Sequence, residues 1–134
     1  GYRIEESGRS FVYLPDHEPS LGAELHDVPV DWMSGHEIAR DADVMLHDAQ
    51  YRDEEYGKHV GWGHSGIGDT MEFARRAEVR ELVLFHHDPY HTDDDLDELL
   101  AAARGAYPEL ASRVCLANEG MTITLDETSV EIRA

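Results

Sequence analysis

The stretch Glu81–His91, ELVLFHHDPYH, carries the clearest structural signal in this sequence. Its apolar run Leu82–Phe85, followed by a breaker at Pro89, is typical of a short buried strand in an α/β sheet. Functional side chains tend to follow the C-terminal end of such a strand. His86 and His87 stand at that position, and they are the only adjacent pair among nine histidines.

A predicted helix lies on each side of this strand. The first covers Asp69–Glu78, where a capping box joins its first residue to Glu72. The second begins at a capping box formed by Thr92 and Asp95, and we expect it to end at Gly105. Both helices carry an apolar stripe at helical spacing, so both are expected to pack on the sheet.

The remaining segments predict a mixed sheet with helices on one face. A hairpin turn is expected at residues 6–9, a loop over 20–34 and a short helix over 35–41. The order of elements predicts parallel strands in the middle of the sheet and antiparallel strands at its ends, with the last strand closing it. The other predicted strands are Tyr2–Glu5, Ser10–Leu14, Ala42–Leu46, Arg113–Ala117 and Met121–Leu125.

Composition limits the classes of partner. With 134 residues and a net charge of −18, the chain is one domain or less, and it repels nucleic acid and anionic membranes in bulk. No apolar run approaches the ~18 residues of a membrane span, and no signal peptide is visible. The single cysteine, Cys115, excludes an intrachain disulfide and favours a reducing, cytoplasmic setting.

The chain opens at Gly1 without a methionine and at once predicts a strand. We therefore expect the gene product to begin further upstream.

Four loops that carry imidazole and carboxylate groups lie at predicted strand ends or before a helix. They are Asp16-His17-Glu18, His47-Asp48, Gly63-His64-Ser65 and His86-His87-Asp88. Such groups suit zinc, manganese or iron, and they suit general acid–base catalysis equally well. A lone histidine at a strand end is more often structural, but four such loops in one short chain favour a common site.

The order of four segments resembles the C-terminal half of a metallo-β-lactamase-fold hydrolase. The segments are Val12–Asp16, Ala42–Ala49, Gly63–Ser65 and Leu82–His86. They resemble the phosphodiesterase branch, which includes the tRNA 3′-processing endonuclease RNase Z and the phosphoribosyl cyclic phosphodiesterase. The resemblance covers roughly residues 2–125, and it rests on order and spacing together.

The resemblance implies a site with two divalent metal ions, zinc or manganese. Asp16 matches the aspartate that bridges the two ions, and His86 matches a histidine ligand. His64 matches a histidine near the scissile phosphate that acts as a proton donor. Asp48 stands where the family often has a glutamate that orients this donor, and its side chain is one methylene shorter.

Four further side chains are predicted to contact substrate because of their position. His17 follows Asp16, and Glu18 comes next; His87 lies beside His86. Trp62 lies between two glycines near the Gly63–Ser65 segment, where its ring could flank a substrate base or pack as core.

The defining His-x-His-x-Asp-His motif of the family is absent from these 134 residues. The sequence therefore predicts that residues 1–134 form the C-terminal half of an αββα sandwich. The expected partner is the N-terminal half of the same fold, on a separate or cleaved chain. A homo-oligomer is also compatible with the sequence.

The function that follows is a metal-dependent hydrolase, most simply a phosphodiesterase for a small or cyclic phosphodiester. A small anionic substrate is favoured over a long polynucleotide, because no basic stripe is present to hold one. Two alternatives remain open at this point: a thioester or lactone hydrolase of the same superfamily, and a metal-free interaction or regulatory half-domain.

Overall fold

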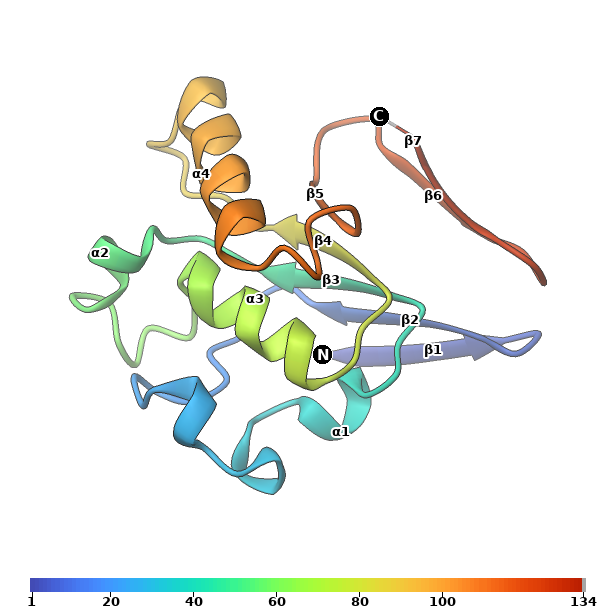
Figure 1. Cartoon of the computed structure of the whole chain (residues 1–134), viewed down its shortest axis with the longest axis horizontal. Coiled ribbons are helices and arrows are strands. Elements are labelled where there is room, and N and C mark those ends of the chain that lie inside the picture. Colours follow the sequence, from blue (N-terminus) through green and yellow to red (C-terminus); the bar gives the residue numbers. More distant parts are fainter. Residues whose placement is uncertain (134) are drawn as a thin grey trace.

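A five-stranded mixed sheet forms the centre of the structure, a computed structural model that describes residues 1–133 (Figure 1). The sheet order is β1-β2-β3-β4-β5. β1 runs antiparallel to β2, and the pairs β2–β3, β3–β4 and β4–β5 are parallel. The predicted antiparallel pairing at the far end is therefore wrong. The strands are β1 (Tyr2–Glu6), β2 (Arg9–Leu14), β3 (Val44–Asp48), β4 (Glu81–Phe85) and β5 (Val114–Leu116).

The turn between β1 and β2 confirms the predicted hairpin. Ser7 and Gly8 occupy its two central positions with φ angles of 51° and 77°. Positive φ at both positions matches the right-handed twist of the flanking strands.

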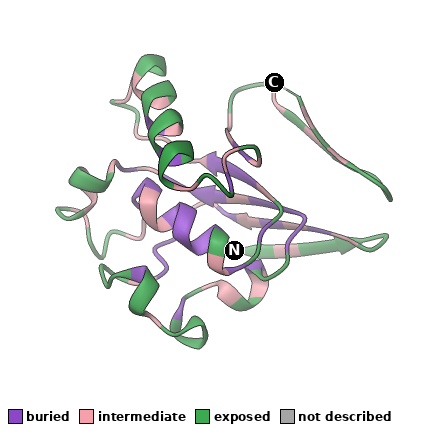
Figure 2. Ribbon diagram, viewed as in Figure 1, coloured by how far each residue is buried: buried purple, intermediate pink, exposed green. Residues whose placement is uncertain are grey.

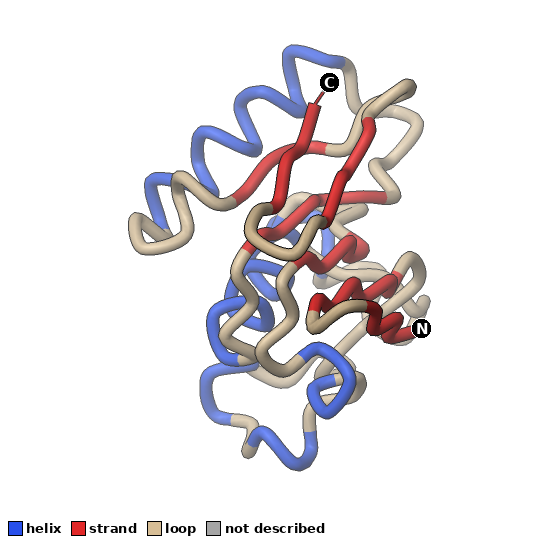
Figure 3. The backbone as a smooth tube through the Cα atoms, turned by 90° about the vertical axis from the view of Figure 1, so that its right-hand side faces the viewer, coloured by secondary structure: helices blue, strands red, loops and turns tan. Residues whose placement is uncertain are grey.

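The helices lie on one face of the sheet, as predicted (Figures 1 and 3). α3 packs closest: its Met71, Phe73 and Ala74 are fully buried against strand residues such as Met45 and Leu84. Figure 2 shows this buried layer between α3 and the strands. The helices are α1 (His36–Ala39), α2 (Asp53–Tyr56), α3 (Ile67–Arg76) and α4 (Asp93–Ala106), with short 3-10 turns η1 (Leu25–Asp27) and η2 (Val30–Trp32).

The predicted start of α3 is wrong. The helix begins at Ile67, and Asp69 lies inside its first turn instead of capping it. Pairing outside the helix sets this start, because the Ile67 amide donates to the Tyr51 carbonyl at 3.0 Å. Glu72 forms no capping box and binds Arg75 one turn later.

The start of α4 is confirmed, and its end is not. The Asp95 amide donates to Thr92 Oγ1 at 3.3 Å, and Asp95 Oδ2 accepts from the Thr92 amide at 2.9 Å. The helix continues through Gly105 to Ala106, and Tyr107 follows as its C-cap. A proline comes next, and proline cannot continue a helix.

The last predicted strand does not close the sheet. Instead β6 (Thr122–Leu125) pairs antiparallel with β7 (Val130–Arg133), and this hairpin stands apart from the main sheet (Figures 1 and 3). Asp126 closes the turn by accepting from the amides of Thr128 and Ser129. Arg9 ties the hairpin to the sheet by donating from Nε to the Asp126 carbonyl at 2.8 Å.

The second face of the sheet is apolar and has no helix over it among residues 1–133 (Figure 3). Because side chains alternate along a strand, Phe11 and Tyr13 point away from the helices that cover Val12 and Leu14. By the same register Leu46 and Phe85 share this face, and all four are half-buried. The β6–β7 hairpin reaches only one end, where a cavity of about 670 Å³ separates it from Ile4 and Phe11.

No helix in the described part of the chain is long and apolar enough to cross a membrane.

Candidate metal and acid-base site

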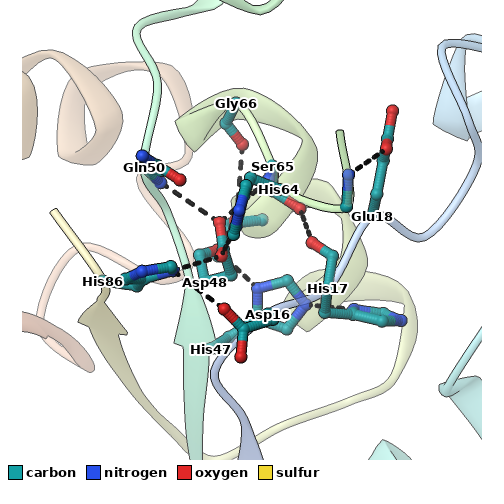
Figure 4. Close-up of polar contacts among 12 residues, drawn as sticks. Asp16, His17, Glu18, His47, Asp48, Gln50, His64, Ser65, Gly66 and His86 are labelled. Carbon is teal, nitrogen blue, oxygen red and sulfur yellow. Dashed lines mark hydrogen bonds and ion pairs between the residues drawn. The ribbon is translucent and has the colours of Figure 1, made fainter. Parts of the chain in front are cut away.

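Four of the eight predicted site residues meet at the edge where the parallel strands end (Figure 4). Asp16 follows β2, Asp48 ends β3, His64 precedes α3 and His86 follows β4. One ligand atom from each lies within 4.8 Å of the others. Parallel strands bring their carboxyl ends to one edge, so residues distant in sequence converge there.

The carboxylate of Asp48 is the centre of this cluster. Its Oδ2 atom accepts from His64 Nδ1 at 2.8 Å and from His86 Nδ1 at 3.0 Å. Its Oδ1 atom accepts from the amides of Ser65 at 2.9 Å and Gln50 at 3.2 Å. Asp48 is fully buried, and these four donors compensate for the lost hydration of its charge.

These contacts fix which nitrogen of each histidine carries the proton. A carboxylate accepts only, so His64 and His86 must both donate from Nδ1 to Asp48. In the neutral ring Nε2 is then the acceptor atom. Each ring therefore presents Nε2 for a metal ion or for a proton, while a carboxylate holds its orientation.

Asp16 and His86 form the open side of the cluster. Asp16 Oδ1 lies 3.5 Å from His86 Nδ1, and the two side chains are 67% and 37% exposed. His86 has a φ of 59°, in the left-handed region that costs a residue with a Cβ about 1–2 kcal/mol. Backbone strain of this kind is often found at active sites and ligand sites.

The backbone around His64 is held from several sides. The Ser65 hydroxyl donates to the His17 carbonyl at 2.6 Å. The Tyr51 amide donates to the Ser65 carbonyl at 3.1 Å, in a bridge that continues β3 beyond Asp48. The His64 ring thus projects from a segment tied to the ends of both β2 and β3.

Glu18 lies buried behind this segment and braces the loop before it. Its carboxylate accepts from the amides of Gly61 at 2.8 Å and Gly63 at 2.9 Å, and from the Tyr56 hydroxyl at 2.9 Å. Burial opposes ionisation, but these donors lower the pKa of Glu18 below its ordinary value. The sequence predicts that Glu18 contacts substrate. In the structure its carboxylate instead binds the amides of the loop that carries Trp62.

His17 lies in the core beneath the site. Its Nδ1 is 2.7 Å from His47 Nε2, and its ring centre is 5.2 Å from that of Phe73. His47 Nδ1 donates to the Asp48 carbonyl at 2.6 Å, so His17 must donate to His47. Burial lowers the pKa of both histidines, and that of His47 falls to about 3. The sequence predicts that His17 contacts substrate, but the structure buries its ring against Phe73 and His47.

His87 and Trp62 do not join the cluster either. His87 is half-buried, and burial lowers its pKa. Trp62 is 66% exposed, and its ring lies 4.8 Å from that of His59, which stacks on Tyr51. The sequence did not single out His59 or Tyr51, since neither residue belongs to a recognisable motif.

The donors at the open side fit a divalent metal ion as part of its coordination shell. Imidazole nitrogen and carboxylate oxygen are ligands for zinc and manganese. Asp16 and His86 face solvent, as expected of a catalytic metal site that keeps an open position. Asp48 is instead occupied by four donors from the protein, so it suits the role of orienting His64 and His86.

The sequence and the fold are both similar to those of known proteins. A model of the beta-lactamase superfamily domain matches residues 1–87. Ribonuclease Z of Brevibacillus brevis is 30% identical over 107 residues, which are 77% of this chain and 30% of that protein. Ribonuclease Z of Methanosarcina mazei is 43% identical over 87 residues, 65% of this chain and 25% of the relative.

The chain thus spans about a quarter to a third of the curated relatives that it matches. Among solved structures, the metallo-beta-lactamase fold protein YhfI from Bacillus subtilis superposes with a TM-score of 0.60. That match covers 98% of this chain and 43% of YhfI at 19% identity, so it is a likeness of fold.

Proposed function

This chain belongs to the beta-lactamase superfamily and has a metallo-β-lactamase-type α/β fold, and from this premise we propose that it contributes to a metal-dependent phosphodiesterase. The observation that carries the proposal is that the Asp48 Oδ2 atom accepts hydrogen bonds from both His64 and His86. This arrangement provides a proton donor beside a metal ligand. The ribonuclease Z relatives support a phosphodiester as the bond that is cleaved.

Asp16 and His86 are the residues that would hold metal, and we propose a pair of zinc or manganese ions. When bound, such ions stabilise negative charge on phosphoryl oxygens and make water a stronger nucleophile. The exposure of both side chains leaves room for a substrate phosphate and for further ligands.

His64 acts as the general acid in this proposal. Its Nδ1 proton stays on the hydrogen bond to Asp48, and its Nε2 proton passes to the departing alkoxide. The buried carboxylate keeps the ring from rotating, because it is itself fixed by the amides of Ser65 and Gln50.

The substrate in this proposal is a small or cyclic phosphodiester. The net charge of −18 repels a long polyanion, and the chain contains a single lysine, Lys58. Arg52, which lies near the site, already binds Asp95 at 2.7 Å. A metal-centred site can still attract a single phosphodiester, because the ions dominate the local field.

We also propose that activity requires a segment with the His-x-His-x-Asp-His motif, which these 134 residues do not contain. The apolar second face of the sheet supports this, since Phe11, Tyr13, Leu46 and Phe85 form a surface suited to a second sheet. Activity tests therefore use the assembly of this chain with such a segment.

The test compares two phosphodiesters that differ only in their leaving group. His64→Ala should lower kcat by about 10²–10⁴ when an alkoxide leaves, because an alkoxide needs a proton. It should have little effect when p-nitrophenolate leaves. His26→Ala, at an exposed histidine outside the site, is the matched control.

Equal losses on both substrates, or no loss on either, would remove His64 as the general acid. A thioester or lactone hydrolase would give a different pattern, with activity on those substrates that depends little on His64.

A further inference from the structure

A groove beside the cluster carries features that the proposed reaction does not use. It has a volume of about 590 Å³, within the range typical of sites for small molecules. One wall comes from the residues after β3, including Tyr51 and His59, together with Trp62. The other comes from the segment after β4, which includes Pro89 and Tyr90.

A series of rings connects the mouth of this groove to the proposed acid. Trp62 meets His59 edge to face, with ring centres 4.8 Å apart. His59 stacks on Tyr51 at 4.2 Å with an interplanar angle of 9°. Tyr51 in turn lies 6.2 Å from His64. The groove therefore adjoins the cluster, because Tyr51 lines the groove and also meets the His64 ring edge to face.

The rim of the groove exposes two large aromatic side chains. Trp62 is 66% exposed and Tyr90 is 92% exposed. The backbone of Tyr90 is fixed by a hydrogen bond from its amide to Asp88 Oδ1 at 2.9 Å. Exposed aromatic rings on ordered segments are characteristic of recognition surfaces, since the rings offer contact area at low entropic cost.

The charges in the groove indicate which part of a substrate it takes. Two cations, Arg52 and Lys58, face three carboxylates, Glu55, Asp88 and Asp95. The balance is −1, and Arg52 is already paired with Asp95. The groove thus has no surplus positive charge for a second phosphate, but its rings suit a neutral planar group.

We propose that this groove binds the nucleobase of a nucleoside phosphodiester whose phosphate reacts beside His64. The inference rests on the proposed phosphodiesterase function and names its substrate class. A ribose links the two positions, so a cyclic mononucleotide or a short dinucleotide fits. A phosphodiester without a base would leave the rings of Trp62 and Tyr90 unused.

Binding can be measured on the 134-residue chain itself, without turnover. Trp32 lies outside the groove, so Trp32→Phe leaves Trp62 as the only indole reporter. In the presence of EDTA, adenosine monophosphate should quench its fluorescence saturably, whereas ribose 5-phosphate should not. Tyr90→Ser should raise the Kd for adenosine monophosphate roughly 5- to 150-fold, as expected for loss of one stacking partner.

Tyr2→Ser is the matched control, because Tyr2 is an exposed tyrosine on β1. It should leave the Kd unchanged. Equal quenching by both ligands, or a Kd that Tyr90→Ser does not alter, would overturn the inference.

Turnover by the assembly of this chain with the motif segment separates this inference from the proposed function. Tyr90→Ser should lower kcat/KM for thymidine 5′-p-nitrophenyl phosphate and spare methyl p-nitrophenyl phosphate. If adenosine monophosphate binds but no phosphodiester is hydrolysed, the groove stands and the proposed function fails. If both diesters are hydrolysed and Tyr90→Ser affects them equally, the proposed function stands and the groove inference fails.

Discussion

At the scale of single residues, Asp16 and Asp48 are two aspartates of one cluster with opposite surroundings. Asp48 is fully buried with four donors, whereas the Asp16 side chain is 67% exposed. Asp48→Asn should lower the free energy of unfolding by about 1–3 kcal/mol, because an amide nitrogen would face hydrogen-bond donors. Asp16→Asn should change it by less than about 0.5 kcal/mol.

Urea unfolding in EDTA measures both effects, and zinc titration of each variant in assembly with the motif segment measures metal affinity. We expect both substitutions to weaken zinc binding. Equal destabilisation by the two variants would show that Asp48 is not the structural centre of the cluster.

A second prediction at this scale concerns Asp69, whose pKa is raised to about 6. Burial is the main cause, and the carboxylates of Asp53 and Glu24 add to it. The folded chain keeps Asp69 protonated at pH values above 3.8, the ordinary pKa of an aspartate. The free energy of unfolding that this group contributes therefore falls as the pH rises from 3.8 to about 6. Asp69→Asn should therefore raise Tm at pH 7.5 and leave it nearly unchanged at pH 3.5.

Thermal unfolding at the two pH values tests this. Asp97→Asn, at an exposed aspartate in α4, is the control and should show no such difference. The prediction would be contradicted by a gain in Tm that is the same at both pH values.

The sequence identifies these residues to unequal degrees. Asp16, Asp48, His64 and His86 could be predicted, because they lie at strand ends or in a short motif before a helix. The burial of Glu18 and the stacking of Tyr51 under His59 could not, since both depend on how the loop over residues 57–63 folds back. That path is fixed by contacts between distant segments, which leave no periodic signal.

At the scale of elements, the loop before α3 depends on one buried carboxylate. Glu18→Gln would place an amide nitrogen against the backbone donors of Gly61 and Gly63. We expect hydrogen exchange of these amides to become roughly 5- to 150-fold faster, in line with about 1–3 kcal/mol for an unmatched buried group. Mass spectrometry of the peptide over residues 57–66 measures this.

Glu54→Gln, at an exposed glutamate in α2, is the matched control and should leave the exchange rates unchanged. Unaltered exchange in the Glu18 variant would mean that other contacts hold the loop.

The boundaries of elements show where local sequence signals suffice. The cap of α4 was predicted, because Thr92 and Asp95 satisfy each other within one turn. The start of α3 was not, because its first amides are set by pairing with Tyr51 from another segment. The pairing of β6 with β7 could not be predicted either, because the alternation over Thr122–Leu125 is the same whichever strand lies beside it.

At the scale of the whole molecule, we expect the second face of the sheet to mediate association. Phe11, Tyr13, Leu46 and Phe85 are half-buried there, with no helix over them among residues 1–133. Contiguous apolar surface of this kind marks an interface. We expect the isolated chain to self-associate and to bind tightly a sheet segment that carries the His-x-His-x-Asp-His motif.

Gel filtration with light scattering tests this expectation. Tyr13→Glu should shift the isolated chain toward a monomer of 15.1 kDa and should abolish binding of the motif segment. Tyr2→Glu, at an exposed tyrosine on β1, should do neither. A monodisperse monomer of the unaltered chain would count strongly against this role of the second face.

The tight turn at Ser7 and Gly8 offers a place where a label can be attached far from the cluster. It precedes β2, whereas Asp16 follows that strand, so the turn lies at the edge opposite the cluster. Ser7 is exposed and already carries a Cβ, whereas a side chain at Gly8 would be strained by its φ of 77°, so Ser7 is the position to modify. A fluorophore, an affinity tag or a tether to a surface could therefore be introduced at this turn, so that the protein is handled from one end while the other stays free for chemistry.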